Sequence, residues 1–128
     1  MSSVQIARYI ISFSWLYHGI LPKLIHIAPL EKLMTASLGL SESMSYLITK
    51  SAGVGEVIFA ILLFVYYQSK VIIVLNIMAL IGLLLFVVAL QPQLLIEAFN
   101  PVTTNLPIIG LSLVLLNSLK AQPENNRR

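Results

Sequence analysis

Ionisable side chains interrupt stretches of this chain that are otherwise apolar. His18 and Lys23 lie in "WLYHGILPKL", and Glu56 follows the glycines of "SAGVGEVIF". A charged group inside hydrocarbon costs about 2.5–3.5 kcal/mol on insertion scales, so a protein keeps one where it has a partner or a use. We therefore expect Glu56 to be a buried acid, with His18 and Lys23 as its hydrogen-bonding or charged partners. The glycines before Glu56 are expected to let a neighbouring helix approach closely.

A second polar group lies in "EAFNPVTTN". Asn100 and Pro101 can end one helix, and Thr103 or Thr104 is then expected to cap the next one. A capped helix N-terminus also presents backbone N–H groups and a partial positive charge to an anionic or carbonyl ligand. Asn100 and Asn105 are therefore predicted to anchor a ligand or the helix terminus.

The composition is that of an integral membrane protein. Of the 128 residues, 58% are hydrophobic and 10% are charged, whereas a soluble domain has about 25% charged residues. The mean hydropathy is +0.90. The absence of cysteine excludes disulfides, thiolate metal sites and thiol chemistry. The net charge of +3 comes from Lys and Arg spread along the chain, with no basic patch for nucleic acid.

Four segments are long enough to cross a bilayer, which takes about 20 apolar residues. Residues 71–90 are the clearest span, and residues 44–67 end in tyrosines of the kind found at membrane interfaces. Residues 102–119 carry threonines, asparagines and a proline, so this span is expected to pack against protein. Residues 4–27 form the first span and contain "WLYHGILPKL", whose proline predicts a kink or a helix end.

Short segments are expected between the first and second spans and between the third and fourth. Pro29 suits a helix start, and an incomplete apolar stripe after it predicts a short amphipathic helix at the membrane interface. "QPQLLIEAFNPVTTN" is expected to form a similar interfacial turn, broken at Asn100–Pro101. The prediction is an all-α, four-helix transmembrane bundle in one domain, residues 1–120, with a polar cytoplasmic tail, residues 121–128.

The distribution of Lys and Arg predicts the orientation of these spans. With a cytoplasmic N-terminus the inside residues are Arg8, Lys70, Lys120, Arg127 and Arg128, and the outside residues are Lys23, Lys32 and Lys50. The bias is sharper if Lys23 and Lys50 are buried. The positive-inside rule therefore favours both termini in the cytoplasm. The expected location is a bacterial inner membrane.

In that topology the polar stretches meet at one depth. Tyr17, His18 and Lys23 lie in the outer half of the first span, and Glu56 lies roughly 18 Å into the second. The start of the fourth span reaches the same level. The sequence therefore predicts an outer-half polar pocket with these candidate ligand-binding residues: Glu56, His18, Lys23, Tyr17, Asn100 and Asn105.

Each of these residues also has a structural interpretation. Glu56 can form an ion pair with Lys23 or Lys50, and His18 can be a hydrogen-bonded packing residue. His18 and His26 are eight residues apart and fall on different helical faces, so no metal site is predicted. No phosphate loop, hydrolase or metalloprotease motif is present, and no catalytic residue is assigned.

The ordered set "WLYHGILPKL", "GVGE" and "EAFNPVTTN" resembles the DoxX-like group of small four-helix membrane proteins, over Arg8 to about Leu119. This resemblance implies a compact four-span architecture. It also implies a link to redox chemistry, because DoxD relatives belong to a thiosulfate:quinone oxidoreductase and other relatives accompany reductase domains. This chain has no cysteine and no recognisable cofactor motif, so quinone is the one cofactor that the resemblance suggests.

Three functions fit this pattern. In the first, the polar pocket binds a small apolar or amphipathic molecule, or supports a membrane or reductase partner protein. In the second, the chain is the membrane subunit of a quinone-linked oxidoreductase, and His18 and Glu56 handle protons. In the third, it is a structural or assembly factor whose polar residues only join helices. The sequence alone leaves open whether the protein is an enzyme.

Overall fold

The computed structural model describes residues 1–98 and 100–121, so the predicted tail lies outside the described residues from residue 122 onward. The described part is helical, without strands, which confirms the predicted all-α class. The elements in chain order are α1 (Ser3–Gly19), the π-helical turn η1 (Ile20–Ile25), α2 (Pro29–Ala36), α3 (Glu42–Val65), α4 (Lys70–Leu90), the 3-10 helix η2 (Pro92–Ile96) and α5 (Pro101–Ala121).

Helices α3, α4 and α5 cover nearly the residues expected for the last three spans. Within the described part of the chain, these three are long and apolar enough to cross a membrane. The first span is built differently. Helix α1 has 17 residues, about 25 Å at 1.5 Å per residue, short of a hydrocarbon core of about 30 Å. The six residues of η1 extend it.

The change from α1 to η1 follows from Pro22. A proline has no N–H, and its ring displaces the carbonyl of the residue four positions earlier, which here is His18. The chain widens into a π turn, in which the N–H of His26 donates to the carbonyl of Leu21 at 3.2 Å. The kink expected in "WLYHGILPKL" is therefore present. It turns Lys23 inward, with only 8% of this residue exposed.

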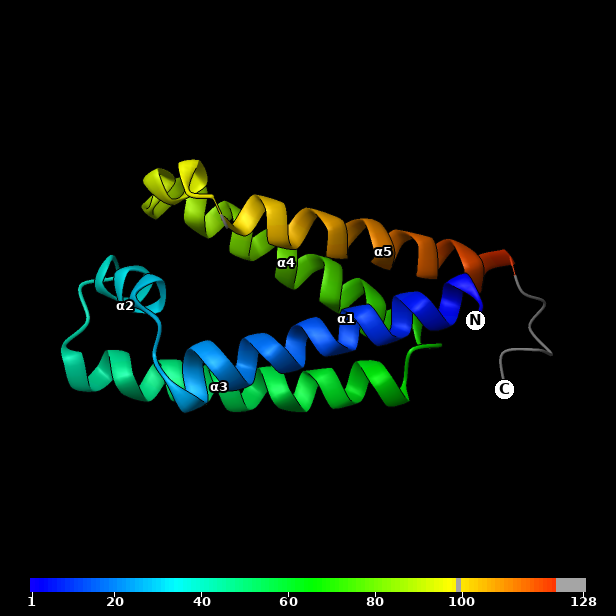
Figure 1. Cartoon of the computed structure of the whole chain (residues 1–128), viewed down its shortest axis with the longest axis horizontal. Coiled ribbons are helices and arrows are strands. Elements are labelled where there is room, and N and C mark those ends of the chain that lie inside the picture. The colour runs from blue at the N-terminus through cyan, green and yellow to red at the C-terminus, as the bar shows by residue number, and fades with distance from the viewer. Residues whose placement is uncertain (99, 122–128) are drawn as a thin grey trace.

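The helices pack as two pairs, α1 with α3 and α4 with α5, and α1 also contacts α5 (Figure 1). The pairs lie close together where α1 begins and α5 ends, and they diverge toward the end that carries α2 and η2 (Figure 1). These two short helices occupy the places predicted for short segments. The hydrophobic core consists of Ala7, Ile11, Leu63, Ile73, Leu80, Ile108, Leu115 and Leu119.

Asn76 connects three helices inside the bundle. Its side chain is fully buried. It accepts a hydrogen bond from Nε1 of Trp15 at 2.7 Å and donates one from Nδ2 to Oγ of Ser112 at 2.5 Å. Ser112 in turn donates to the carbonyl of Ile108 at 2.7 Å. The strongly polar residue in the interior of α4 therefore joins α1 and α5 through its side-chain amide.

Gly19 and Gly53 set the closest approach of α1 to α3. A Cβ atom on Gly19 would lie 2.7 Å from the Gly53 carbonyl oxygen, and one on Gly53 would lie 2.9 Å from the Gly19 carbonyl oxygen. The expectation of a close helix approach is met at Gly53. Gly55 differs, because a Cβ there would meet no described atom within 4 Å.

Candidate functional site

A cavity of about 330 Å³ opens between the diverging helices, within the range of about 300–1,000 Å³ typical of small-molecule sites. Much of its wall is apolar and comes from Trp15, Met34, Leu80, Leu83, Val87, Leu94 and Ile108. The polar lining consists of Ser14, His18, Lys23, Glu31, Glu56, Asn100, Thr104 and Asn105. Five of the six predicted site residues therefore meet at one cavity.

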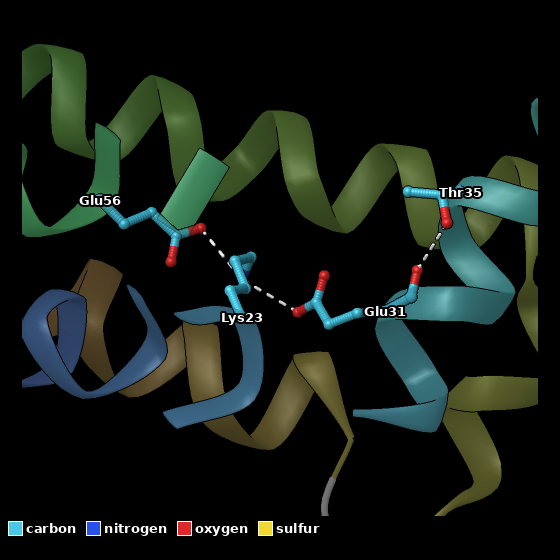
Figure 2. A network of polar contacts seen from close by, with 4 residues as sticks. All are labelled: Lys23, Glu31, Thr35 and Glu56. Atoms are coloured by element: carbon cyan, nitrogen blue, oxygen red, sulfur yellow. Dashed lines mark hydrogen bonds and ion pairs between the residues drawn. The ribbon is translucent and has the colours of Figure 1, made fainter. Parts of the chain in front are cut away.

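Lys23 lies at the centre of the charged lining. Its Nζ is 2.9 Å from Oε1 of Glu31 and 3.1 Å from Oε1 of Glu56. Figure 2 shows the lysine of η1 between these carboxylates, which come from α2 and α3. Of the two partners expected for Glu56, Lys23 is the one in contact. Lys50 instead donates to the carbonyl of Leu24.

Two buried polar atoms at the cavity lack partners. Within the described part of the chain, Oε2 of Glu56 and Nδ2 of Asn105 form no hydrogen bond. Asn105 is only 4% exposed. A buried polar atom without a partner costs about 1–3 kcal/mol, and such atoms in native proteins call for a specific explanation. The cavity thus offers one free acceptor and one free donor.

Asn100 serves as the N-cap of α5. Its Oδ1 accepts from the N–H groups of Val102 at 2.9 Å and Thr103 at 3.1 Å, and its Nδ2 donates to the Glu97 carbonyl at 2.8 Å. The expectation that Thr103 or Thr104 is the cap is therefore wrong, because the helix begins at Pro101, before both threonines. Asn100 borders the cavity with its amide already engaged.

His18 and Tyr17 face different surroundings. The His18 side chain lines the cavity and makes no hydrogen bond with the described residues. Tyr17 does not line the cavity; it is 52% exposed, and its ring centroid lies 6.0 Å from that of Phe13. Consecutive helical residues are rotated by about 100°. Tyr17 therefore points away from the face that carries Trp15 and His18.

Sequence reasoning missed Glu31, and it left Thr104 out of the candidate ligand-binding residues because a capping role was favoured. An acidic residue in the first turn of a short helix is common, because it complements the helix dipole. Because that role already explains an acidic residue at this position, the sequence does not indicate that Glu31 also pairs with Lys23. Thr104 lies within the first turn of α5, where its hydroxyl is 3.2 Å from the Asn100 carbonyl oxygen, so it is not the cap of that helix. No pattern in the sequence distinguishes its additional place at the cavity wall.

A shallow groove runs between α3 and α4. Its lining consists of Trp15, Ala52, Gly55, Glu56, Phe59, Leu75 and Ala79. Three of these residues, Trp15, Ala52 and Glu56, also line the cavity. The groove therefore adjoins the cavity on the side where α3 and α4 make few contacts.

A sequence profile of the DoxX-like family matches residues 12–113, which is most of the chain. The chain belongs to the DoxX-like family. The matched range of this DoxX-like protein contains every residue that lines the cavity. Together with three apolar helices of sufficient length, the assignment makes it an integral membrane protein. A search of curated proteins and a search of solved structures each find no match.

Proposed function

We propose that this DoxX-like protein binds a small amphipathic molecule from the bilayer in the cavity. The observation that carries the proposal is the pair of free polar atoms, Oε2 of Glu56 and Nδ2 of Asn105, beside an apolar wall. A ligand with a polar head satisfies both atoms, and its apolar part covers side chains such as Leu83 and Met34. Such a division between apolar walls and a few polar groups is typical of ligand sites.

The ligand reaches the cavity sideways from the lipid, through the groove between α3 and α4. Small residues line this path, namely Ala52, Gly55 and Ala79. Hydrophobic side chains next to the groove, such as Ile58 and Met78, are exposed, as expected for a surface in contact with lipid. An apolar molecule can therefore enter without crossing water.

The membrane and orientation are part of the same proposal: a bacterial inner membrane, with both termini in the cytoplasm. Lys23 and Lys50 are engaged inside the protein, which leaves fewer loop charges at the end that carries α2. Arg8, Lys70 and Lys120 lie toward the opposite end, so the charge bias supports this orientation. The cavity then lies in the outer half of the bilayer.

A second candidate function is that of a membrane subunit in a quinone-linked oxidoreductase. The observation that favours it is the uncommitted imidazole of His18, which lines the cavity together with Glu56. Reduction of a quinone takes up two electrons and two protons. In this candidate, a membrane or reductase partner supplies the electrons, and His18 and Glu56 deliver the protons.

Extraction of the purified protein tests the first proposal. Organic extracts of wild type and of Glu56→Gln are compared by mass spectrometry, with the melting temperature of each variant measured in parallel. We expect an amphipathic molecule that is enriched in wild type and depleted in the folded variant. Equal extracts from both proteins would remove Glu56 from the site. A loss of stability alone, with no ligand in wild type, would support a structural or assembly role.

A further inference from the structure

We infer that the cavity selects a ligand whose head group is neutral and carries a hydroxyl, and that it rejects carboxylate and phosphate head groups. This inference rests on the proposed function and specifies the class of ligand. It is derived from the charges that line the cavity and from the two polar atoms that the protein leaves free.

The charge balance disfavours an anion. The lining contains two carboxylates, Glu31 and Glu56, and a single Lys or Arg residue, Lys23. Both carboxylates contact the same ammonium group, at 2.9 and 3.1 Å. The two carboxylates therefore share one ammonium group, and the three side chains together carry a net negative charge. An anionic head group would add a third negative charge beside carboxylate side chains that are only 19% and 20% exposed, where charges repel more strongly than in bulk water.

The free hydrogen-bonding groups of the cavity further restrict the head group of the ligand. A carboxylate oxygen such as Oε2 of Glu56 only accepts, and an amide nitrogen such as Nδ2 of Asn105 only donates. The ligand must therefore bring both a donor and an acceptor. A hydroxyl group supplies both, whereas a carboxylate only accepts and an ammonium group only donates. An oxidised quinone has only acceptors, but a quinol has hydroxyls.

Contacts with the rest of the protein hold Asn105 and Glu56 in position at the cavity. Asn105 lies in the first turns of α5 and is almost completely buried. Its Oδ1 lies 3.4 Å from Oγ1 of Thr104, a hydroxyl whose one hydrogen is also within reach of the Asn100 and Pro101 carbonyl oxygens at 3.2 Å. Its Nδ2 has no partner among the described residues and is the donor for a ligand. Glu56 is held through its other oxygen by Lys23. The free atoms are therefore defined by contacts that fix the rest of each side chain.

The fluorescence of Trp15 reports whether a ligand occupies the cavity. Trp15 is the only tryptophan in the chain, and it lines the cavity. A bromine atom near an indole ring quenches its fluorescence. The probes are ω-brominated undecanol, undecanoic acid, undecylamine and undecyl phosphate, which share one tail and differ in the head group. Each is titrated into the full chain in lipid nanodiscs.

The bulk lipid needs its own control, because brominated tails also dissolve in the bilayer. In Trp15→Phe/Met78→Trp the indole moves to a lipid-facing position on α4, since Met78 is 61% exposed. Quenching of this variant measures the tail concentration in the surrounding lipid. Quenching of Trp15 beyond that level measures binding in the cavity.

We expect the alcohol to quench Trp15 at about tenfold lower concentration than the acid or the phosphate. In Glu56→Gln, this preference over the acid should shrink, because one negative charge is gone. In Asn105→Leu, binding of the alcohol should weaken, because the free donor is gone. A wild-type preference for the acid, phosphate or amine would overturn the inference while leaving a binding function intact.

A quinol and the corresponding quinone provide a second test in the same quenching experiment. The brominated decyl quinol should reach half-maximal quenching of Trp15 at a lower concentration than the corresponding quinone, because only the quinol donates to Glu56. Equal half-maximal concentrations for both would contradict the inference. If no probe quenches Trp15 beyond the lipid control, the proposed function itself fails. The failures of the two proposals are therefore distinguishable in wild type, whatever the stability of the variants.

Discussion

The Nζ atom of Lys23 lies 3.1 Å from Oε1 of Glu56, which joins η1 to α3. The same ammonium group holds Glu31 of α2. One lysine therefore links η1, α2 and α3 at the open end of the bundle, where the helix pairs diverge (Figure 1). The position of this lysine depends on the π turn at Pro22, so a local backbone feature determines the charge arrangement of the cavity.

Substitution Lys23→Met should destabilise the protein by about 2 kcal/mol. Breaking a buried ion pair costs about 3–5 kcal/mol, and the cost is lower here because the Glu31 and Glu56 side chains are 19% and 20% exposed. Thermal unfolding in detergent measures the effect. Lys23→Met/Glu56→Gln should recover part of the loss. A double variant that is less stable than Lys23→Met would contradict the assigned pairing.

Asn76→Leu should lower stability by about 1–3 kcal/mol. The substitution removes the hydrogen bonds to Trp15 and Ser112, and hydrogen bonds between membrane helices contribute about 0.6–1.7 kcal/mol each. Chemical denaturation in mixed micelles measures the loss. Asn117→Leu is the matched control, since Asn117 forms no side-chain hydrogen bond with the described residues. An equal loss in both variants would refute the role of the Asn76 network.

Gly53→Ala should destabilise the protein by about 1–3 kcal/mol, the typical cost of overpacking. Its new methyl group would meet the Gly19 carbonyl oxygen at 2.9 Å and Cβ of Lys23 at 2.9 Å. Gly55→Ala on the same helix has open space and should be neutral or slightly stabilising. Melting temperatures of the pair give the test. If the two substitutions have the same effect, α1 and α3 do not cross at Gly53.

Gly55→Phe should slow the exchange of ligand between lipid and cavity. Gly55 lines the groove between α3 and α4 and has room for a larger side chain. A phenyl ring there narrows the path, so the quenching of Trp15 by brominated undecanol should develop more slowly, by about tenfold. Gly82→Phe is the control, because Gly82 also has open space but lies outside the groove. Equal rates would exclude this route.

The sequence predicts the fold well because long apolar runs determine helices in a membrane. It also predicts an ion pair of Glu56 with Lys23 or Lys50, because all three are charged groups that hydrocarbon would penalise, but it does not choose between the two lysines. The residue number predicts how deep a side chain lies in the membrane. It does not predict as well which side of the helix faces the bundle, and for that reason the sequence predicts Tyr17 in the pocket although it faces outward.

Other features depend on tertiary arrangement. Glu31 reaches Lys23 only because α2 folds back over the open end of the bundle, and no periodic pattern reports the position of a short helix. The role of Asn105 is similar. Its amide is expected at the start of the fourth span, but its lack of a hydrogen-bonding partner follows from the packing around it.

The central claim, that the cavity holds one amphipathic molecule, is tested most directly by native mass spectrometry of the full chain released from detergent. Wild type should carry a single bound molecule per chain. The adduct should be lost in Glu56→Gln/Asn105→Leu and kept in Ser118→Ala, a control on the exposed face of α5, outside the cavity. A wild-type chain without any adduct, or the same adduct in all three proteins, would contradict the claim.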